Sequence, residues 1–180
     1  ISGFTQMSLV TLQRIVQTGG GYRDMAAYIV LCSGVNGKAN NRASTHGAKS
    51  IADRSGMTYR MAEKTLEWLQ DAAIIKPAEN LTPPDSKRPK ASVPRWDIFD
   101  ERLDVAVARQ FTERYPNSTR TDTPLQRMIE GINGNDDIPR SQAVMDAILL
   151  YATLLKEQDF GGFAGVDPNI LHGKFVPIDP

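Results

Sequence analysis

The sequence predicts a mostly α-helical protein that carries a small β-hairpin and ends in a helical C-terminal part. Apolar residues recur at helical spacing over most of the chain. A single glycine, Gly56, separates two of these helical patterns. A proline-rich stretch at 77–94 separates two short apolar segments that are typical of strands. With 180 residues, 41% of them hydrophobic, the chain has the size and composition of one ordinary domain.

Two helices and a loop are expected in the first 44 residues. Residues 8–18 have the apolar spacing of a short helix, and the glycines at 19–21 end it. Residues 23–33 are apolar around most of the helical circumference, as in a central buried helix. Turn-forming residues dominate 34–44 and predict a loop.

A pair of helices is expected around Gly56. Ser44 or Thr45 can cap a helix that reaches to about Arg54, and Thr58 can cap a second helix. A sharp turn between them requires a positive φ, which glycine adopts readily. The second helix is predicted to bury one face, formed by Ala62, Leu66, Leu69 and Ala73.

The segments "AAII" and "RWDIF" are predicted to pair as a hairpin with a long tip at 77–94. Trp68 is expected to pack under this hairpin, with a stacking platform for single strands as the alternative. Residues 1–100 carry 13 Lys and Arg against 9 Asp and Glu, a balance of +4. The excess is concentrated at 38–64 and 87–95, which favours a polyanion bound by one face. An ordinary solvated surface is the alternative.

The C-terminal part, residues 101–180, is expected to be a mainly helical extension. Residues 124–132 and 140–159 are amphipathic, whereas 101–111 fits a strand or a helix equally well. This part carries 8 basic against 12 acidic residues, a balance of −4 that disfavours nucleic acid. It is expected to complete the core, to form a homodimer interface, or to bind a partner such as another replication protein.

Catalytic and metal-binding patterns are absent from the sequence. His46 and His172 have no ligand-spaced companions, and "HGAKS" at 46–50 lacks the spacing of a phosphate-binding loop. Cys32, the one cysteine, is expected in the core. No enzyme activity, cofactor or membrane association is therefore predicted, and the cysteine content fits a cytoplasmic setting.

Two stretches resemble a known family. "SIADRSGMTYRMAEKTLEWLQDAAII" at 50–75 resembles the winged helix-turn-helix of bacterial replication-initiation and regulatory proteins. "YRDMAAYIVLCSGVNGKANN" at 22–41 is similar to the first helix and polar loop of such domains in phage, plasmid and integrative-element replication proteins. The resemblance covers about residues 22–100 and implies a winged helix-turn-helix domain at 1–100. Ser55 and Thr65 depart from the pattern, because apolar or small residues are commoner there.

The resemblance implies double-stranded DNA binding, in replication initiation or maintenance of a mobile element. A sequence-specific transcriptional regulator and a protein-interaction module without DNA binding are the alternatives. The implied base contacts are Thr58, Tyr59, Arg60, Glu63 and Lys64; Lys49 and Arg54 would lie nearer the DNA backbone, and Lys87, Arg88 and Lys90 would form the wing tip. Some of these side chains have purely structural alternatives. Tyr59 could pack on the first helix, and Glu63 and Glu67 could pair with neighbouring cations.

Overall fold

A computed structural model describes residues 4–35, 43–78, 96–98, 103–114 and 121–157. These residues form a mostly helical structure with small antiparallel sheets, as the sequence predicts. The helices are α1 (Leu9–Gln17), α2 (Tyr22–Ser33), α3 (Ala48–Ser55), α4 (Tyr59–Asp71), α5 (Pro124–Gly131) and α6 (Arg140–Lys156), with a 3-10 helix, η2 (Arg109–Thr112). The strands are β1 (Phe4–Met7), β2 (Ala43–Ser44), β3 (Ile75–Pro77), β4 (Trp96–Ile98) and β5 (Val105–Ala108).

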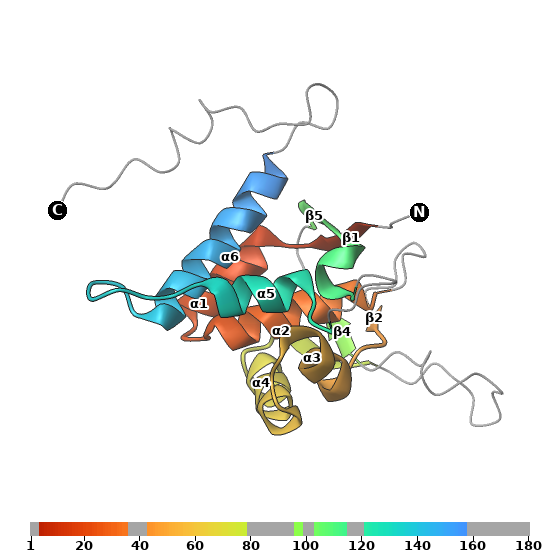
Figure 1. Cartoon of the computed structure of the whole chain (residues 1–180). Coiled ribbons are helices and arrows are strands. Elements are labelled where there is room, and N and C mark those ends of the chain that lie inside the picture. The colour runs from red at the N-terminus through yellow and green to blue at the C-terminus, as the bar shows by residue number, and fades with distance from the viewer. Residues whose placement is uncertain (1–3, 36–42, 79–95, 99–102, 115–120, 158–180) are drawn as a thin grey trace, which may run out of the picture.

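Helix α2 is the centre of the molecule, as its apolar sequence predicts. Every residue from Met25 to Ser33 is buried. Helices α1, α3, α4 and α6 all pack against it, as do β1, β2, β4 and η2. Figure 1 shows α2 enclosed, with α6 above it and the pair α3–α4 below. The helical pair therefore rests on a rigid support.

A three-stranded antiparallel sheet has the order β2-β4-β3. Ile75 of β3 pairs with Ile98 of β4, and both side chains are buried in the core. This pairing confirms that the two predicted segments meet as antiparallel strands. Of "AAII", however, only Ile75 lies in β3, because the residues before it form the turn that follows α4. Pro77 lies in β3, an edge strand, where its missing amide hydrogen costs no ladder hydrogen bond. The hairpin tip lies outside the described residues.

A second sheet joins the first described strand to a strand from the second half of the chain. Strand β1 pairs antiparallel with β5, so that Phe4 lies opposite Ala108 and Met7 opposite Val105. The ambiguous segment 101–111 thus contains a strand followed by η2. Helix α6 packs against α1, α2 and β5. Buried residues from both sides of residue 100 belong to one hydrophobic cluster.

Three local predictions were wrong. Residues 43–44, which were expected in the loop at 34–44, form strand β2 and pair with β4. Gly47, not Ser44 or Thr45, precedes α3 as its N-cap. Ser44 lies in β2 instead, where its hydroxyl donates to the Leu31 carbonyl at 2.6 Å. Ala73 does not belong to the buried face of α4, because it follows the helix with a φ of 54° and is exposed. The core position is taken by Ile74, which is fully buried.

Candidate nucleic-acid interface

The turn between α3 and α4 has the predicted backbone conformation. Gly56 ends α3 with a φ of 77°, and its amide donates to the Ala52 carbonyl at 3.1 Å. The buried Ser55 hydroxyl donates to the Ile51 carbonyl at 2.6 Å, which satisfies its polar group inside the helix. Thr58 then caps α4, because its side chain accepts a hydrogen bond from the Met61 amide at 3.3 Å. The turn is therefore closed by hydrogen bonds on both sides.

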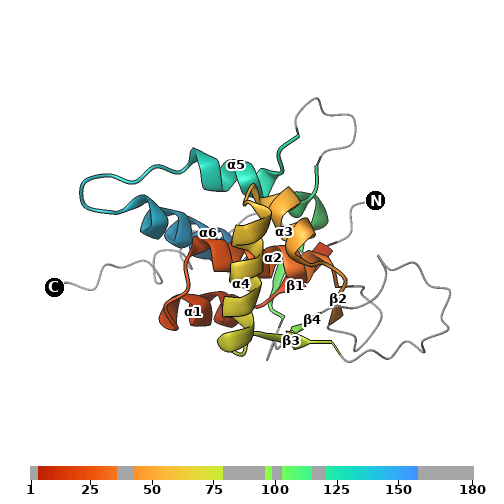
Figure 2. The ribbon, with the colours of Figure 1, turned by 90° about the horizontal axis from the view of Figure 1, so that it is seen from below.

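Helix α4 separates a buried face from an exposed one. Ala62, Thr65, Leu66 and Leu69 are buried, which confirms the predicted apolar stripe except for Ala73 and adds Thr65 to it. Figure 2 shows α4 lying across the outside of α2, with its length exposed to view. A helix placed in this way presents a continuous polar surface to a partner.

The exposed face carries most of the predicted contact residues. Tyr59 is 55% exposed, so more than half of its surface is open to a partner. Thr58, Arg60, Glu63 and Lys64 are exposed on α4, and Lys49 is exposed on α3. Within the described part of the chain, no ion pair involves Lys49, Arg60 or Lys64. These three cations are therefore available to an external anion. Lys87, Arg88 and Lys90 lie outside the described residues.

Arg54 differs from the other candidates. Its guanidinium donates to the Thr112 carbonyl at 3.1 Å and lies 3.6 Å from the Glu113 carboxylate. Its own carbonyl accepts a hydrogen bond from the Thr123 hydroxyl, which also caps α5. Arg54 thus connects α3 to the C-terminal part of the chain. The long separation along the sequence left no local signal for this role.

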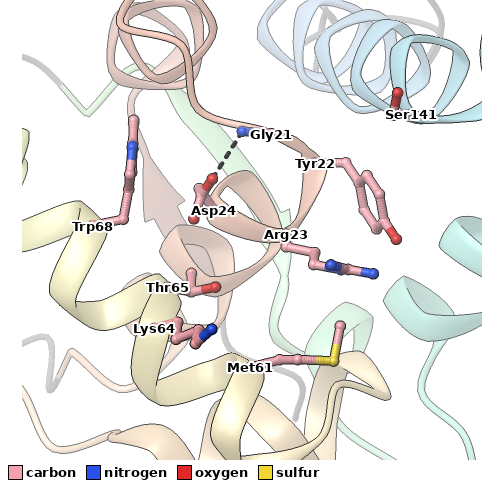
Figure 3. Close-up of a pocket in the computed structure, with 9 residues that line it drawn as sticks. All are labelled: Gly21, Tyr22, Arg23, Asp24, Met61, Lys64, Thr65, Trp68 and Ser141. Carbon is pink, nitrogen blue, oxygen red and sulfur yellow. Dashed lines mark hydrogen bonds between the residues drawn. The ribbon is translucent and has the colours of Figure 1, made fainter.

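A hollow of about 380 Å³ lies beside α4, between it and the start of α2. Figure 3 shows its lining, in which Arg23 projects from α2 and Lys64 from α4. Asp24 also lies there, and its carboxylate accepts a hydrogen bond from the Gly21 amide at 2.8 Å. Burial raises the pKa of Asp24, outweighing the hydrogen bonds from Gly21 and Thr65, which lower it.

Trp68 forms one wall of the same hollow. Its indole packs against Gly20, where a β-carbon would lie only 2.6 Å from the ring. Trp68 therefore has the predicted packing role, and it joins α4 to the turn between α1 and α2. Its relation to the hairpin tip is not tested, because the tip lies outside the described residues. Arg23 was missed as a site residue, because nothing near it in the sequence shows that α4 lies alongside.

The described residues offer no cluster of three metal-binding side chains. His46 has a structural role, since its Nδ1 lies 2.9 Å from the Val30 carbonyl at the end of α2. Burial lowers the pKa of His46, which favours the neutral ring. Among the described helices, none has both the length and the apolar character to span a bilayer.

Comparison with known proteins adds no relative. No protein-family model matches the chain, and no curated protein and no solved structure matches it either.

Proposed function

We propose that the chain binds double-stranded DNA through a winged helix-turn-helix formed by α2, β2, α3, α4, β3 and β4. The element order supports this proposal: a buried helix, a short strand, two helices joined by a tight turn, and two paired strands. The sheet order β2-β4-β3 supports it as well, because the last strand returns between the other two. Helix α4 then serves as the recognition helix.

The observation that carries the proposal is the exposed, polar N-terminal half of α4. A helix with its side chains is about 10–12 Å wide, and the major groove of B-DNA is about 12 Å wide. Tyr59 and Arg60 lie in the first turn, where a recognition helix contacts base edges. The Arg60 guanidinium can donate to both major-groove acceptors of one guanine.

The resemblance of about residues 22–100 to replication proteins supports a role in replication initiation or maintenance of a mobile element. In that role, sequence-specific binding would direct the protein to an origin. A transcriptional regulator would use the same surface, so a binding experiment tests both roles together.

Binding-site selection on random duplexes, followed by affinity measurements at graded salt, tests the proposal. The parent is expected to lose affinity linearly on a log–log plot, with a slope magnitude of roughly 4–6. Arg60→Ala is expected to relax preference at one base pair by about 1–3 kcal/mol and to leave the slope nearly unchanged.

Arg114→Ala provides a matched control, because Arg114 is exposed beyond η2 and belongs to neither α3 nor α4. It is expected to retain the parent's preference and affinity. Absence of duplex binding by the parent at low salt would contradict DNA binding and support a protein-interaction role. A base preference that Arg60→Ala leaves intact would contradict α4 as the reading element.

A further inference from the structure

The hollow between α2 and α4 contains two cations from different helices. Arg23 is exposed near the start of α2, and Lys64 is exposed in the middle of α4. Both side chains line the hollow, and Figure 3 shows Lys64 on the side of α4 and Arg23 extending toward Tyr22 on the opposite side. Among the described residues neither forms an ion pair, although Arg23 lies 5.5 Å from the centre of the Tyr22 ring. Two cations that line one hollow without a salt bridge favour an anion there, although Arg23 also attracts the Asp24 carboxylate.

The remaining lining adds hydrogen-bonding capacity and one opposing charge. Ser141 contributes a hydroxyl from α6. Asp24 is the one acid of the lining, and its carboxylate is held by the Gly21 amide at the start of α2. The helix end is therefore already capped, and the two side-chain cations, not the helix end, supply the attraction. Arg23 and Lys64 together outweigh Asp24 by one positive charge.

The position of Lys64 on α4 relates the hollow to the DNA surface. Lys64 follows Arg60 by four residues, so the two lie on one face of the helix about 6 Å apart along its axis. A helix that enters a groove by its N-terminal end places the later residue nearer the groove's edge, where the phosphates are. Arg23 lines the same hollow from α2.

We propose that this hollow receives one phosphate of the DNA backbone, held jointly by Arg23 and Lys64. The inference rests on the proposed DNA binding and deepens it by naming a backbone contact. Lys64 then positions α4 in the groove and does not read a base. Arg23 then binds DNA from α2, a helix for which the sequence predicts only a central, buried position.

The test compares Arg23→Gln, Lys64→Gln and the double variant with the parent and with Arg114→Gln. Affinity is measured at graded salt for the selected duplex and for a duplex of unrelated sequence. Glutamine keeps most of the side-chain length and removes the charge. Thermal unfolding curves that match the parent's are expected, because both side chains are exposed.

Each single variant is expected to weaken both duplexes by the same factor. If one phosphate is shared, the double variant shrinks the log–log slope by about 1, the value for one phosphate contact. The Arg114→Gln slope should equal the parent's. If the slope of the log–log salt plot of the double variant fell by about 2, the two side chains would contact two separate phosphates, and the shared site would be overturned.

Two further outcomes would also overturn the inference. One is a Lys64→Gln variant that changes base preference, because Lys64 would then read sequence. The other is binding of inorganic phosphate that Arg23→Gln abolishes, although Arg23→Gln and Lys64→Gln bind duplex as tightly as the parent does. The hollow would then bind a small anion and not the DNA backbone. In each case the parent still binds duplex, so failure of the shared site is distinguished from failure of the proposed function.

Discussion

Two tight connections join consecutive helices, at 18–21 and at 56–58. Gly19 in the first has a φ of 85°, much like that of Gly56 in the second, but Gly20 and Gly56 require glycine for different physical reasons. Gly20 is buried, and a β-carbon there would lie 2.6 Å from both the Ile15 and the Trp68 side chains and 2.8 Å from the Ile15 carbonyl. Gly56 is exposed, and a β-carbon there would approach only the side chain of Gln126, at 2.8 Å or more. The requirement at Gly56 is its φ of 77°.

This difference shows how the two halves of α4 are held. The C-terminal half is fixed by close packing, because Trp68 occupies the space that a side chain at residue 20 would need. The N-terminal end is fixed by the backbone conformation of an exposed turn and by the Thr58 cap. The end proposed to enter DNA is thus positioned without being covered.

The largest expected effect is at residue 20. Gly20→Ala should lower the free energy of unfolding by about 3 kcal/mol, since overpacking a dense site costs about 1–3 kcal/mol and the Ile15 backbone cannot move aside easily. Urea unfolding measures this loss. Gly21→Ala is the control, because its β-carbon would meet only the Asp24 carboxylate at 3.9 Å. It should cost about 1 kcal/mol or less. If Gly20→Ala and Gly21→Ala lost the same free energy of unfolding, steric crowding would not be the reason that residue 20 must be glycine.

A smaller effect is expected at residue 56. Gly56→Ala should cost about 1–2 kcal/mol, the penalty for placing a β-carbon at positive φ. Gly56→Asn should cost less, because asparagine tolerates this conformation. Denaturant unfolding is measured for Gly56→Ala, Gln126→Ala and the double variant. The comparison distinguishes backbone strain at residue 56 from a steric clash of its β-carbon with the Gln126 side chain. A coupling energy near zero supports strain alone, since the Gln126 side chain is flexible. If removal of Gln126 restored stability, a collision would be the cause and the comparison with Gly20 would fail.

The smallest expected effect is the pH dependence of stability that comes from the N-terminal caps of α2 and α4, the helices that follow the two connections. The cap of α2 is the Asp24 carboxylate and that of α4 is the Thr58 hydroxyl, so only the first titrates. Because burial raises the folded-state pKa of Asp24, its contribution to stability is greatest below the ordinary carboxyl pKa. It is lost as the pH rises through the raised value.

Unfolding free energies measured from about pH 3 to pH 7 should reveal this contribution. Asp24→Asn should remove it and become relatively more stable than the parent as the pH rises. Thr58→Ala should lose a constant amount of roughly 0.5–2 kcal/mol at every pH. An Asp24→Asn variant whose difference from the parent is independent of pH would contradict the raised pKa.

Features set by neighbouring residues could be predicted from the sequence. The positive φ of Gly56, the Thr58 cap and the stripe of Ala62, Leu66 and Leu69 follow from local conformation and helical spacing. The N-cap of α3 could not, because Ser44 is drawn into β2 by its bond to the Leu31 carbonyl, 13 residues earlier.

Features set by distant residues required the fold. Arg54 looks like any exposed cation in the sequence, but Thr112 and Glu113 bind it across 58 and 59 residues. Arg23 and Lys64 are 41 residues apart, and only the packing of α4 on α2 brings them to one hollow. Contacts of this kind depend on tertiary arrangement, which a local pattern of residue types does not encode.

The pairing of β1 with β5 has a consequence for synthesis of the chain. Phe4 lies opposite Ala108, so the first strand has no partner until about a hundred more residues have been made. At about 5–20 residues per second, that delay is on the order of 5–20 s. Strand β1 therefore emerges from the ribosome long before β5, its partner in the sheet, has been synthesised. Helices α2, α3 and α4, whose contacts are more local, are able to associate first, and closure of the β1–β5 ladder becomes a late step of folding.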